Sequence, residues 1–131
     1  MSYASHADYA MVALCVWRED RSGQTEGMTA VACVIRNRVL RDKSTYFDEC
    51  TRRWQFSSLT AMGDPELTLY PTDNDPTWEK AQMIAEKIID GEITDITGGA
   101  TSYYALSIPT PPSWASTMIH TVDIGGQTFF K

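Results

Sequence analysis

Apolar residues recur with a helical period in the first third of the chain. The first stripe comprises Tyr9, Val12, Ala13 and Val16. Its i, i+3, i+4, i+7 spacing predicts a helix over residues 5–18, with Ser5 or Asp8 as the cap. A second stripe comprises Val31, Val34, Ile35 and Val39. It predicts a helix over residues 26–40, and because residues 28–34 are nearly all small or apolar, we expect burial on most sides.

The middle of the chain has no strong period. Residues 42–75 contain Pro, Gly, Asp and Thr at irregular spacing, and we expect at most a turn of helix there, within residues 50–59. A third helix has clear start and stop signals, with Asp75 as the cap, Pro76 at the first position and Gly91 at the end. Its expected buried face comprises Trp78, Ala81, Ile84, Ala85 and Ile88.

Patterns typical of β-strands follow the third helix. Residues 101–105 and 121–124 are rich in Tyr, Thr, Val and Ile, and Gly125-Gly126 is a two-residue hairpin signal. The order of the elements predicts an α+β fold with a mainly helical body and a small C-terminal β element. With 131 residues, the chain is expected to be a single domain over residues 1–131.

Charge and composition exclude several classes of partner. The net charge is −6, which argues against nucleic acid and against anionic lipid as the main partner, since both attract Lys and Arg. The N-terminus has neither a basic nor an apolar segment of a signal peptide, and the longest apolar run is shorter than the ~18 residues that a membrane span needs. We therefore expect synthesis in the cytosol and no stable membrane insertion.

The cysteines and histidines give no sign of a metal site. Cys15, Cys33 and Cys50 are odd in number and form no C-x-x-C pair, so we expect three reduced thiols, no bound metal and no cofactor. His6 and His120 have no motif neighbours. No nucleophile elbow, phosphate loop or metalloprotease pattern occurs, which leaves carboxylate chemistry, with glycosidic bond cleavage as its main case.

One carboxylate is unusual in its position. Glu19 lies seven residues after Val12 and thus continues the apolar stripe at the C-terminal end of the first helix. Desolvation and the negative end of the helix dipole should both raise its pKa, as a general acid requires. The alternative is an ordinary terminal Glu that turns to solvent or pairs with Arg18, Arg21 or Arg38. Asp20 points about 100° away on a helix, so it is not an obvious second catalytic carboxylate.

Several aromatic residues lie in or beside expected loops. They are Trp54, Tyr103, Tyr104 and Trp114. Flat rings with polar edges suit the faces of sugar rings, although each ring could also simply pack against its own loop.

The chain resembles the SleB-type cell wall hydrolases through motifs in family order. Residues 14–19 read Leu-Cys-Val-Trp-Arg-Glu, and Glu-Gly and Asn-Arg-Val follow at 26–27 and 37–39. Residues 55–57 read Gln-Phe-Ser, and residues 97–104 read Thr-Gly-Gly-Ala-Thr-Ser-Tyr-Tyr. Pro-Ser-Trp-Ala at 112–115 and Ile-Gly-Gly-Gln-Thr-Phe-Phe at 124–130 complete the set. Each motif is weak alone, but the ordered set covers nearly the whole chain.

The resemblance implies a lysozyme-like fold and cleavage of the β-1,4 bond between N-acetylmuramic acid and N-acetylglucosamine in peptidoglycan. It maps the single catalytic Glu of lytic transglycosylases onto Glu19, and it implies that peptidoglycan glycan strands are the partner. We expect the chain to be a monomer. The expected substrate-binding residues are Gln55, Ser57, Tyr103, Tyr104 and Trp114. A phage lysin released by a holin, or carried in the virion, would bring such a cytosolic product to the wall.

The chain departs from the family pattern at three places. Residues 20–23 read Asp-Arg-Ser-Gly where the family has Ala-Arg-Gly-Glu, and Ser102 and Gln127 replace family His residues. Two alternatives therefore stay open. One is a hydrolytic muramidase in which Asp20, Glu26, Asp48 or Glu49 activates water. The other is a wall-binding or virion component without catalysis.

The negative net charge also bears on how the chain would approach an anionic wall. We expect weak salt dependence of activity, because long-range attraction cannot drive the encounter. A local basic patch would change this, and its candidate residues are Arg36, Arg38, Arg52 and Arg53.

Overall fold

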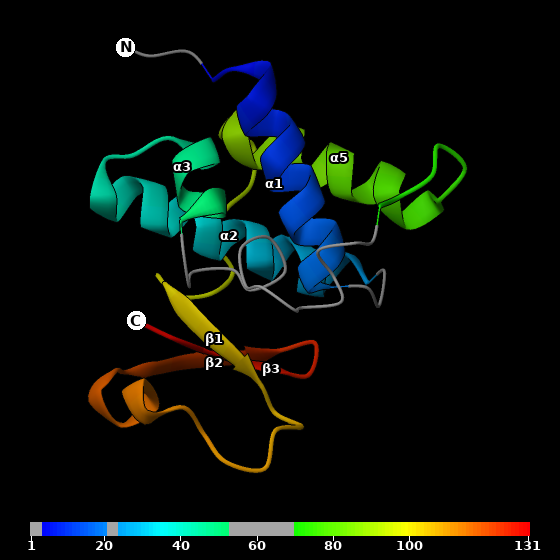
Figure 1. Ribbon diagram of the computed structural model, residues 1–131. Coiled ribbons are helices and arrows are strands. Elements are labelled where there is room, and N and C mark those ends of the chain that lie inside the picture. The colour runs from blue at the N-terminus through cyan, green and yellow to red at the C-terminus, as the bar shows by residue number, and fades with distance from the viewer. Residues whose placement is uncertain (1–3, 21–23, 53–69) are drawn as a thin grey trace.

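The helices gather into one body, and a small antiparallel sheet lies on one side of it (Figure 1). The computed structural model describes residues 4–20, 24–52 and 70–131. Within them the elements are α1 (His6–Glu19), α2 (Thr25–Asp42), α3 (Tyr46–Thr51), α5 (Pro76–Ile89), β1 (Ser102–Ala105), a 3₁₀ helix η2 (Ser113–Thr117), β2 (His120–Ile124) and β3 (Gln127–Phe130). The predicted α+β class is confirmed.

Helix α1 begins at a capping box formed by Ser5 and Asp8, and Asp8 also accepts a hydrogen bond from helix α3. Ser5 Oγ accepts a hydrogen bond from the Asp8 backbone N–H at 3.2 Å, and the Ser5 backbone N–H donates to Asp8 Oδ2 at 2.8 Å. The other carboxylate oxygen of Asp8 accepts from the Phe47 backbone N–H at 2.8 Å. Both predicted capping residues therefore take part, and Asp8 ties the start of α3 to the start of α1.

The short helix of the middle segment lies earlier than expected. It was predicted within residues 50–59, whereas α3 spans Tyr46–Thr51. The reason is the cap: Thr45 Oγ1 accepts from the Asp48 backbone N–H at 3.0 Å and fixes the first turn. Residues 53–59 of the expected range lie outside the described residues.

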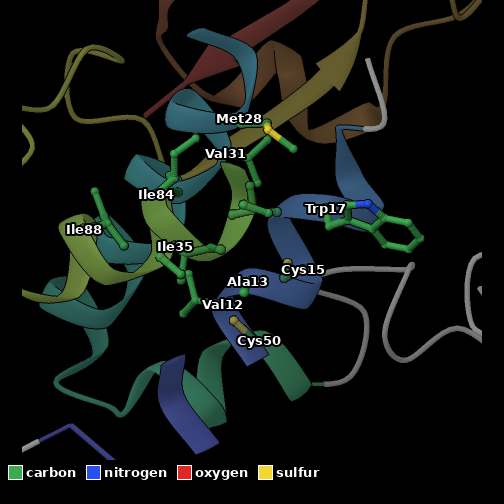
Figure 2. Close-up of a cluster of buried hydrophobic side chains, with 14 of the residues drawn as sticks. Val12, Ala13, Cys15, Trp17, Met28, Val31, Ile35, Cys50, Ile84 and Ile88 are labelled. Carbon is green, nitrogen blue, oxygen red and sulfur yellow. The ribbon is translucent and has the colours of Figure 1, made fainter. Parts of the chain in front are cut away.

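The core fills the space between α1, α2, α5 and the short α3. Figure 2 shows Val12 of α1, Val31 and Ile35 of α2, and Ile84 and Ile88 of α5 converging there, all of them buried. The predicted faces are confirmed in their central residues. Their ends differ, since Tyr9, Val39 and Trp78 are only partly buried. All three cysteines are buried, and none of them forms a disulfide.

A side-chain contact joins the end of α1 to the beginning of α5. The Trp17 indole Nε1–H lies within hydrogen-bonding distance of Asp75 Oδ2, at 3.1 Å, and of Thr77 Oγ1, at 3.0 Å. Asp75 is the cap of α5, and its Oδ1 accepts from the Thr77 backbone N–H at 2.9 Å. The predicted cap of α5 therefore also positions the last turns of α1.

The sheet has the strand order β1-β3-β2, and both pairs of strands are antiparallel. The turn between β2 and β3 consists of Gly125 and Gly126, which have φ values of 58° and 81°, as the predicted two-residue hairpin requires. Phe129 and Ile124 pack with Ala30 and Val34 of α2 in a second apolar cluster. This cluster attaches the sheet to the helical body.

Membrane insertion was not expected from the sequence. None of the helices in the described parts of the chain is long and apolar enough to cross a membrane.

The Trp17 contact can be tested by a double-mutant cycle. Trp17→Phe removes the indole donor and should lower the free energy of unfolding by about 1.5 kcal/mol, measured by urea titration. In a Thr77→Val background the same substitution should cost less, because one acceptor is already gone. An equal cost in both backgrounds would contradict a contribution from Thr77.

Candidate active site

The C-terminal end of α1, the first turn of α2 and the β2–β3 turn meet at Gly27. The carboxylate of Asp20 occupies the space that a Cβ at position 27 would fill. On another side, a Cβ at Gly125 would lie 3.4 Å from the Gly27 Cα. The absence of a Cβ at Gly27 therefore leaves room for the Asp20 carboxylate, and this gives the Glu-Gly motif a physical reason. Glu19 is the last residue of α1 at this junction.

Glu19 lies at the edge of the core. The preceding stripe residues Val12, Cys15 and Val16 are fully buried, whereas Glu19 is half-buried. Burial raises the pKa of Tyr103 well above its ordinary value, and the charge of Glu19 raises it further. Burial likewise raises the pKa of the Cys15 thiol, with Cys50 and then Glu19 adding to the effect. The Glu19 carboxylate is thus within electrostatic reach of both Tyr103 and Cys15, which keep their protons at neutral pH.

Two of the arginines named as possible partners of Glu19 each have a further contact of their own. The guanidinium of Arg18 lies over the ring of Tyr70, with 5.0 Å between the Cζ atom and the ring centroid. Arg38 is buried, and its Nε–H donates to the Thr101 carbonyl oxygen at 2.6 Å. Arg21 lies outside the described residues.

Polar residues of α2 hold the loop that leads into β1. Asn37 donates from Nδ2 to the Ala100 carbonyl oxygen at 2.8 Å and to Asp95 Oδ2 at 3.2 Å. Asp95 in turn accepts from the backbone N–H groups of Thr97 and Gly99, both at 2.8 Å. Burial alone would raise the pKa of Asp95, but these hydrogen bonds outweigh burial and lower its pKa. The network fixes the start of β1, and therefore the place of Tyr103.

The roles of Asn37, Arg38 and Asp95 were not predicted. The available signal was the Asn-Arg pair beside the apolar stripe of α2, because polar side chains that are buried or partly buried need partners from another segment. The motif around Gly98-Gly99 was also informative, since these residues have φ values of 69° and 87°. Both motifs fix the shape of the loop that leads into β1.

The predicted aromatic residues lie on two faces of the sheet. Tyr103 faces the helices and its ring centroid is 5.4 Å from that of Phe129. Tyr104 faces away, with its ring 5.8 Å from Trp114 and 5.6 Å from Phe130. Successive side chains of a strand point to opposite faces, so Tyr103 and Tyr104 cannot share one surface. Of the three, Tyr103 alone lies on the Glu19 side.

The remaining site predictions have different outcomes. Gln55, Ser57 and Trp54 lie outside the described residues. Gln127 pairs with Ala105 and shares the face of Tyr103, whereas Ser102 pairs with Phe130 on the opposite face. The two positions where the family has His are therefore on different sides of the sheet.

The other carboxylates considered as catalytic bases differ in burial and in their neighbours. Glu49 is fully buried, and its Oε1 lies 3.1 Å from Arg52 Nη2. Burial and the neighbouring Asp42 raise the pKa of Glu49, while Arg41 and Glu49 hold that of Asp42 far below its usual range. Both acids contact Arg52, whose Nη1 lies 3.0 Å from Asp42 Oδ2 and whose Nη2 lies 3.1 Å from Glu49 Oε1. Asp48 and Glu26 are exposed in the first turns of α3 and α2.

Within the described ranges, no group of three or more His, Cys, Asp or Glu residues could hold a metal ion. The groups at the end of α1 are a half-buried carboxyl group, a buried phenol and a buried thiol, and the charge of the buried Arg38 acts on both the phenol and the thiol.

Comparison with known proteins identifies relatives of this arrangement. A family profile described as Cell Wall Hydrolase matches residues 22–130. The chain is also similar to two solved structures, each with a TM-score of 0.76 over 100% of this chain. The catalytic domain of the germination-specific lytic transglycosylase SleB from Bacillus anthracis has 26% identity, with 99% of that chain covered. The catalytic domain of the Bacillus cereus SleB protein has 28% identity, with 94% covered. No curated protein sequence matches the chain.

The junction at Gly27 gives a sharp test of the site geometry. Gly27→Ala places a Cβ where the Asp20 carboxylate lies, so that side chain must move aside, and the substitution should cost about 1 kcal/mol of unfolding free energy. In an Asp20→Ala background the clash is absent, so Gly27→Ala should be neutral or stabilising through its higher helix propensity. Urea unfolding of the four variants measures this. A destabilisation that persists without the Asp20 carboxylate would contradict the described junction.

Proposed function

The chain belongs to the cell wall hydrolase family, and from this premise we propose that it is a lytic transglycosylase that cleaves peptidoglycan with Glu19 as its acid and base. The bond cleaved is the β-1,4 linkage from N-acetylmuramic acid to N-acetylglucosamine. Support comes from the similarity to a SleB catalytic domain described as a lytic transglycosylase. The family profile begins at residue 22, after Glu19, so the catalytic assignment depends on the geometry of α1 and on the motif resemblance.

The proposed reaction needs one carboxyl group. Glu19 donates its proton to the glycosidic oxygen as the bond from that oxygen to C1 of the muramic residue breaks. The 6-hydroxyl oxygen of the same sugar then bonds to C1, and its proton passes to the Glu19 carboxylate. The product is a 1,6-anhydro end, and the enzyme regains its starting protonation state. A single positioned acid and base of this kind typically contributes about 10²–10⁴-fold to the rate.

The position of Glu19 is the observation that carries the proposal. Its half-buried carboxyl group lies at the negative end of α1 and within electrostatic reach of Tyr103. The raised pKa expected for Glu19 stays a prediction. The competing muramidase would need a second carboxylate to activate water. Asp20 packs against Gly27, and Glu49 is buried beside Arg52. Neither position favours a muramidase mechanism.

We assign the aromatic residues two different parts in binding the glycan. Tyr103 shares the Glu19 side and backs the carboxyl group at the bond to be cleaved. Tyr104 and Trp114 form one cluster with Phe130 on the far face of the sheet, where they could contact only a distant part of a strand. Gln55 and Ser57 stay predictions from the motif. A phage-lysin role, its release route and a monomeric state also stay predictions.

Replacing the acid tests the proposal directly. Glu19→Gln keeps the size of the side chain but cannot donate the proton, so turnover of purified peptidoglycan should fall at least about 100-fold with an unchanged circular dichroism spectrum. Glu92→Gln, at an exposed residue beyond α5, is the matched control and should keep wild-type activity. Full activity of Glu19→Gln would refute the assignment.

Product analysis by mass spectrometry separates the competing functions. Anhydromuramic ends are expected. Reducing ends, together with activity loss in Glu26→Gln or Asp20→Asn, would support the muramidase instead. Saturable binding of peptidoglycan without any cleavage would support a binding module.

Salt dependence tests how the chain approaches its substrate. The candidate basic patch is dispersed: Arg36 donates to the Ile93 carbonyl oxygen at 2.5 Å, Arg38 is buried, and Arg52 pairs with Asp42 and Glu49. Arg53 lies outside the described residues. We therefore expect activity to change by no more than about twofold between roughly 0.05 and 0.2 M ionic strength. A steep fall would instead indicate a cationic surface that steers the encounter.

A further inference from the structure

A depression of about 240 Å³ lies between α1 and α5, where these two helices pack side by side (Figure 1). Two helix faces line it, with His6, Tyr9 and Ala13 from α1 and Trp78, Gln82 and Glu86 from α5. The three α5 residues are four positions apart, so they form one row along the helix. Ala13 is small and buried, and it therefore forms the floor of the depression.

Two aromatic rings of the depression are held in place by neighbours. The Tyr9 hydroxyl donates a hydrogen bond to Asp90 Oδ1 at 2.6 Å. The ring of Trp78 lies edge-on to that of Trp17, with 6.5 Å between the centroids. Tyr9 and Trp78 are each partly exposed, so both rings offer apolar surface to a ligand. Because the rings are already positioned, little side-chain freedom is lost when a ligand binds.

The polar groups of the depression suit a neutral ligand that carries hydroxyl and amide groups. Gln82 and Glu86 are exposed, and within the described residues neither side chain makes a hydrogen bond or an ion pair. The Gln82 amide offers both donors and an acceptor, whereas the Glu86 carboxylate only accepts. Among the described residues that line the depression none is Lys or Arg, so an anionic ligand is disfavoured.

Flat rings beside polar groups are the surroundings that sugars prefer. Aromatic rings pack on the apolar face of a pyranose, while amide and carboxylate groups pair with the polar edge of the sugar. The volume of about 240 Å³ is below the roughly 300–1,000 Å³ of sites for drug-sized molecules. The depression therefore has room for a single ring-sized unit.

We propose that this depression binds one neutral N-acetylhexosamine residue of a glycan, at a site separate from the bond that is cleaved. The sugar face packs against Tyr9 and Trp78, a sugar hydroxyl donates to the Glu86 carboxylate, and the acetamido group pairs with the Gln82 amide. The choice of glycan rests on the proposed function, because peptidoglycan strands carry N-acetylglucosamine at alternate positions.

The site is too far from Glu19 to take part in cleavage. Tyr9 precedes Glu19 by ten residues, which is about 15 Å along α1. Ala13 precedes it by six residues and so points about 120° away around the helix. A sugar in the depression is therefore held without being cleaved. A second contact of this kind raises the effective concentration of other strands at Glu19, and it needs no positive charge on a chain of net charge −6.

Binding can be measured without cleavage. The probe is N,N′-diacetylchitobiose, titrated into the ¹⁵N-labelled chain and followed by NMR. Saturable amide shifts should occur at residues 6–13 and 78–86, and shifts around Glu19 are followed separately. Gln82→Ala removes the amide contact and should weaken the affinity at the depression at least about threefold. The matched control is Met83→Ala, a truncation of the next exposed residue, which points about 100° away on α5 and should leave the affinity unchanged.

Three results would overturn the inference. They are the absence of saturable shifts at the depression, equal weakening by the two truncations, and displacement of the sugar by tetramethylammonium chloride, which would identify a cation site instead. Both truncated residues are exposed, so both variants are expected to fold, and circular dichroism checks this.

Cosedimentation with insoluble peptidoglycan gives a second readout. In a Glu19→Gln background, Gln82→Ala should lower the bound fraction, whereas Met83→Ala should not. Cleavage of peptidoglycan by the wild-type chain without chitobiose shifts at the depression would refute this sugar site alone. Chitobiose shifts at the depression without any cleavage would refute the proposed function and support the sugar site.

Discussion

The close approach of backbone segments at Gly27 is the constraint on which the candidate site depends. The Asp20 carboxylate at the end of α1 fills the space that a Cβ of Gly27 would need, and in the β2–β3 turn a Cβ at Gly125 would lie 3.4 Å from the Gly27 Cα. The junction determines where Glu19 lies relative to the sheet. The Trp17 indole fixes the same end of α1 from the other side through the cap of α5. The last turn of α1 is therefore restrained by α2, by α5 and by the sheet.

A second restraint acts through α2. Its apolar residues face the core and the sheet, while Asn37 and Arg38 bind the carbonyl groups of Ala100 and Thr101. Buried amide and guanidinium groups are costly unless they are paired, so these contacts specify one loop conformation before β1. Residues of the family motifs thus divide into a few that could perform chemistry and more that hold the backbone in place.

The structure shows where the departures from the family pattern lie. Asp20 stands where the family has Ala, and its carboxylate packs against Gly27. The two positions where the family has His lie on opposite faces of the sheet, so they cannot act on one point of a substrate. Gln127 is on the same face as Tyr103 and can affect the Glu19 side, whereas Ser102 belongs with the aromatic cluster of the outer face. Loss of the two histidines is therefore two separate changes.

The sequence by itself determined the elements and their buried faces. Helical spacing in α1, α2 and α5, the Asp75-Pro76 start and the Gly125-Gly126 turn are local signals, and local backbone preferences are sufficient to read them. It also singled out Glu19, because a charged residue at a position of an apolar stripe departs from the local pattern. Only the tertiary structure decided which residues accompany Glu19. Strand alternation separated Tyr103 from Tyr104 and Trp114, and contacts across some sixty residues joined Asn37 to Ala100 and Trp17 to Thr77.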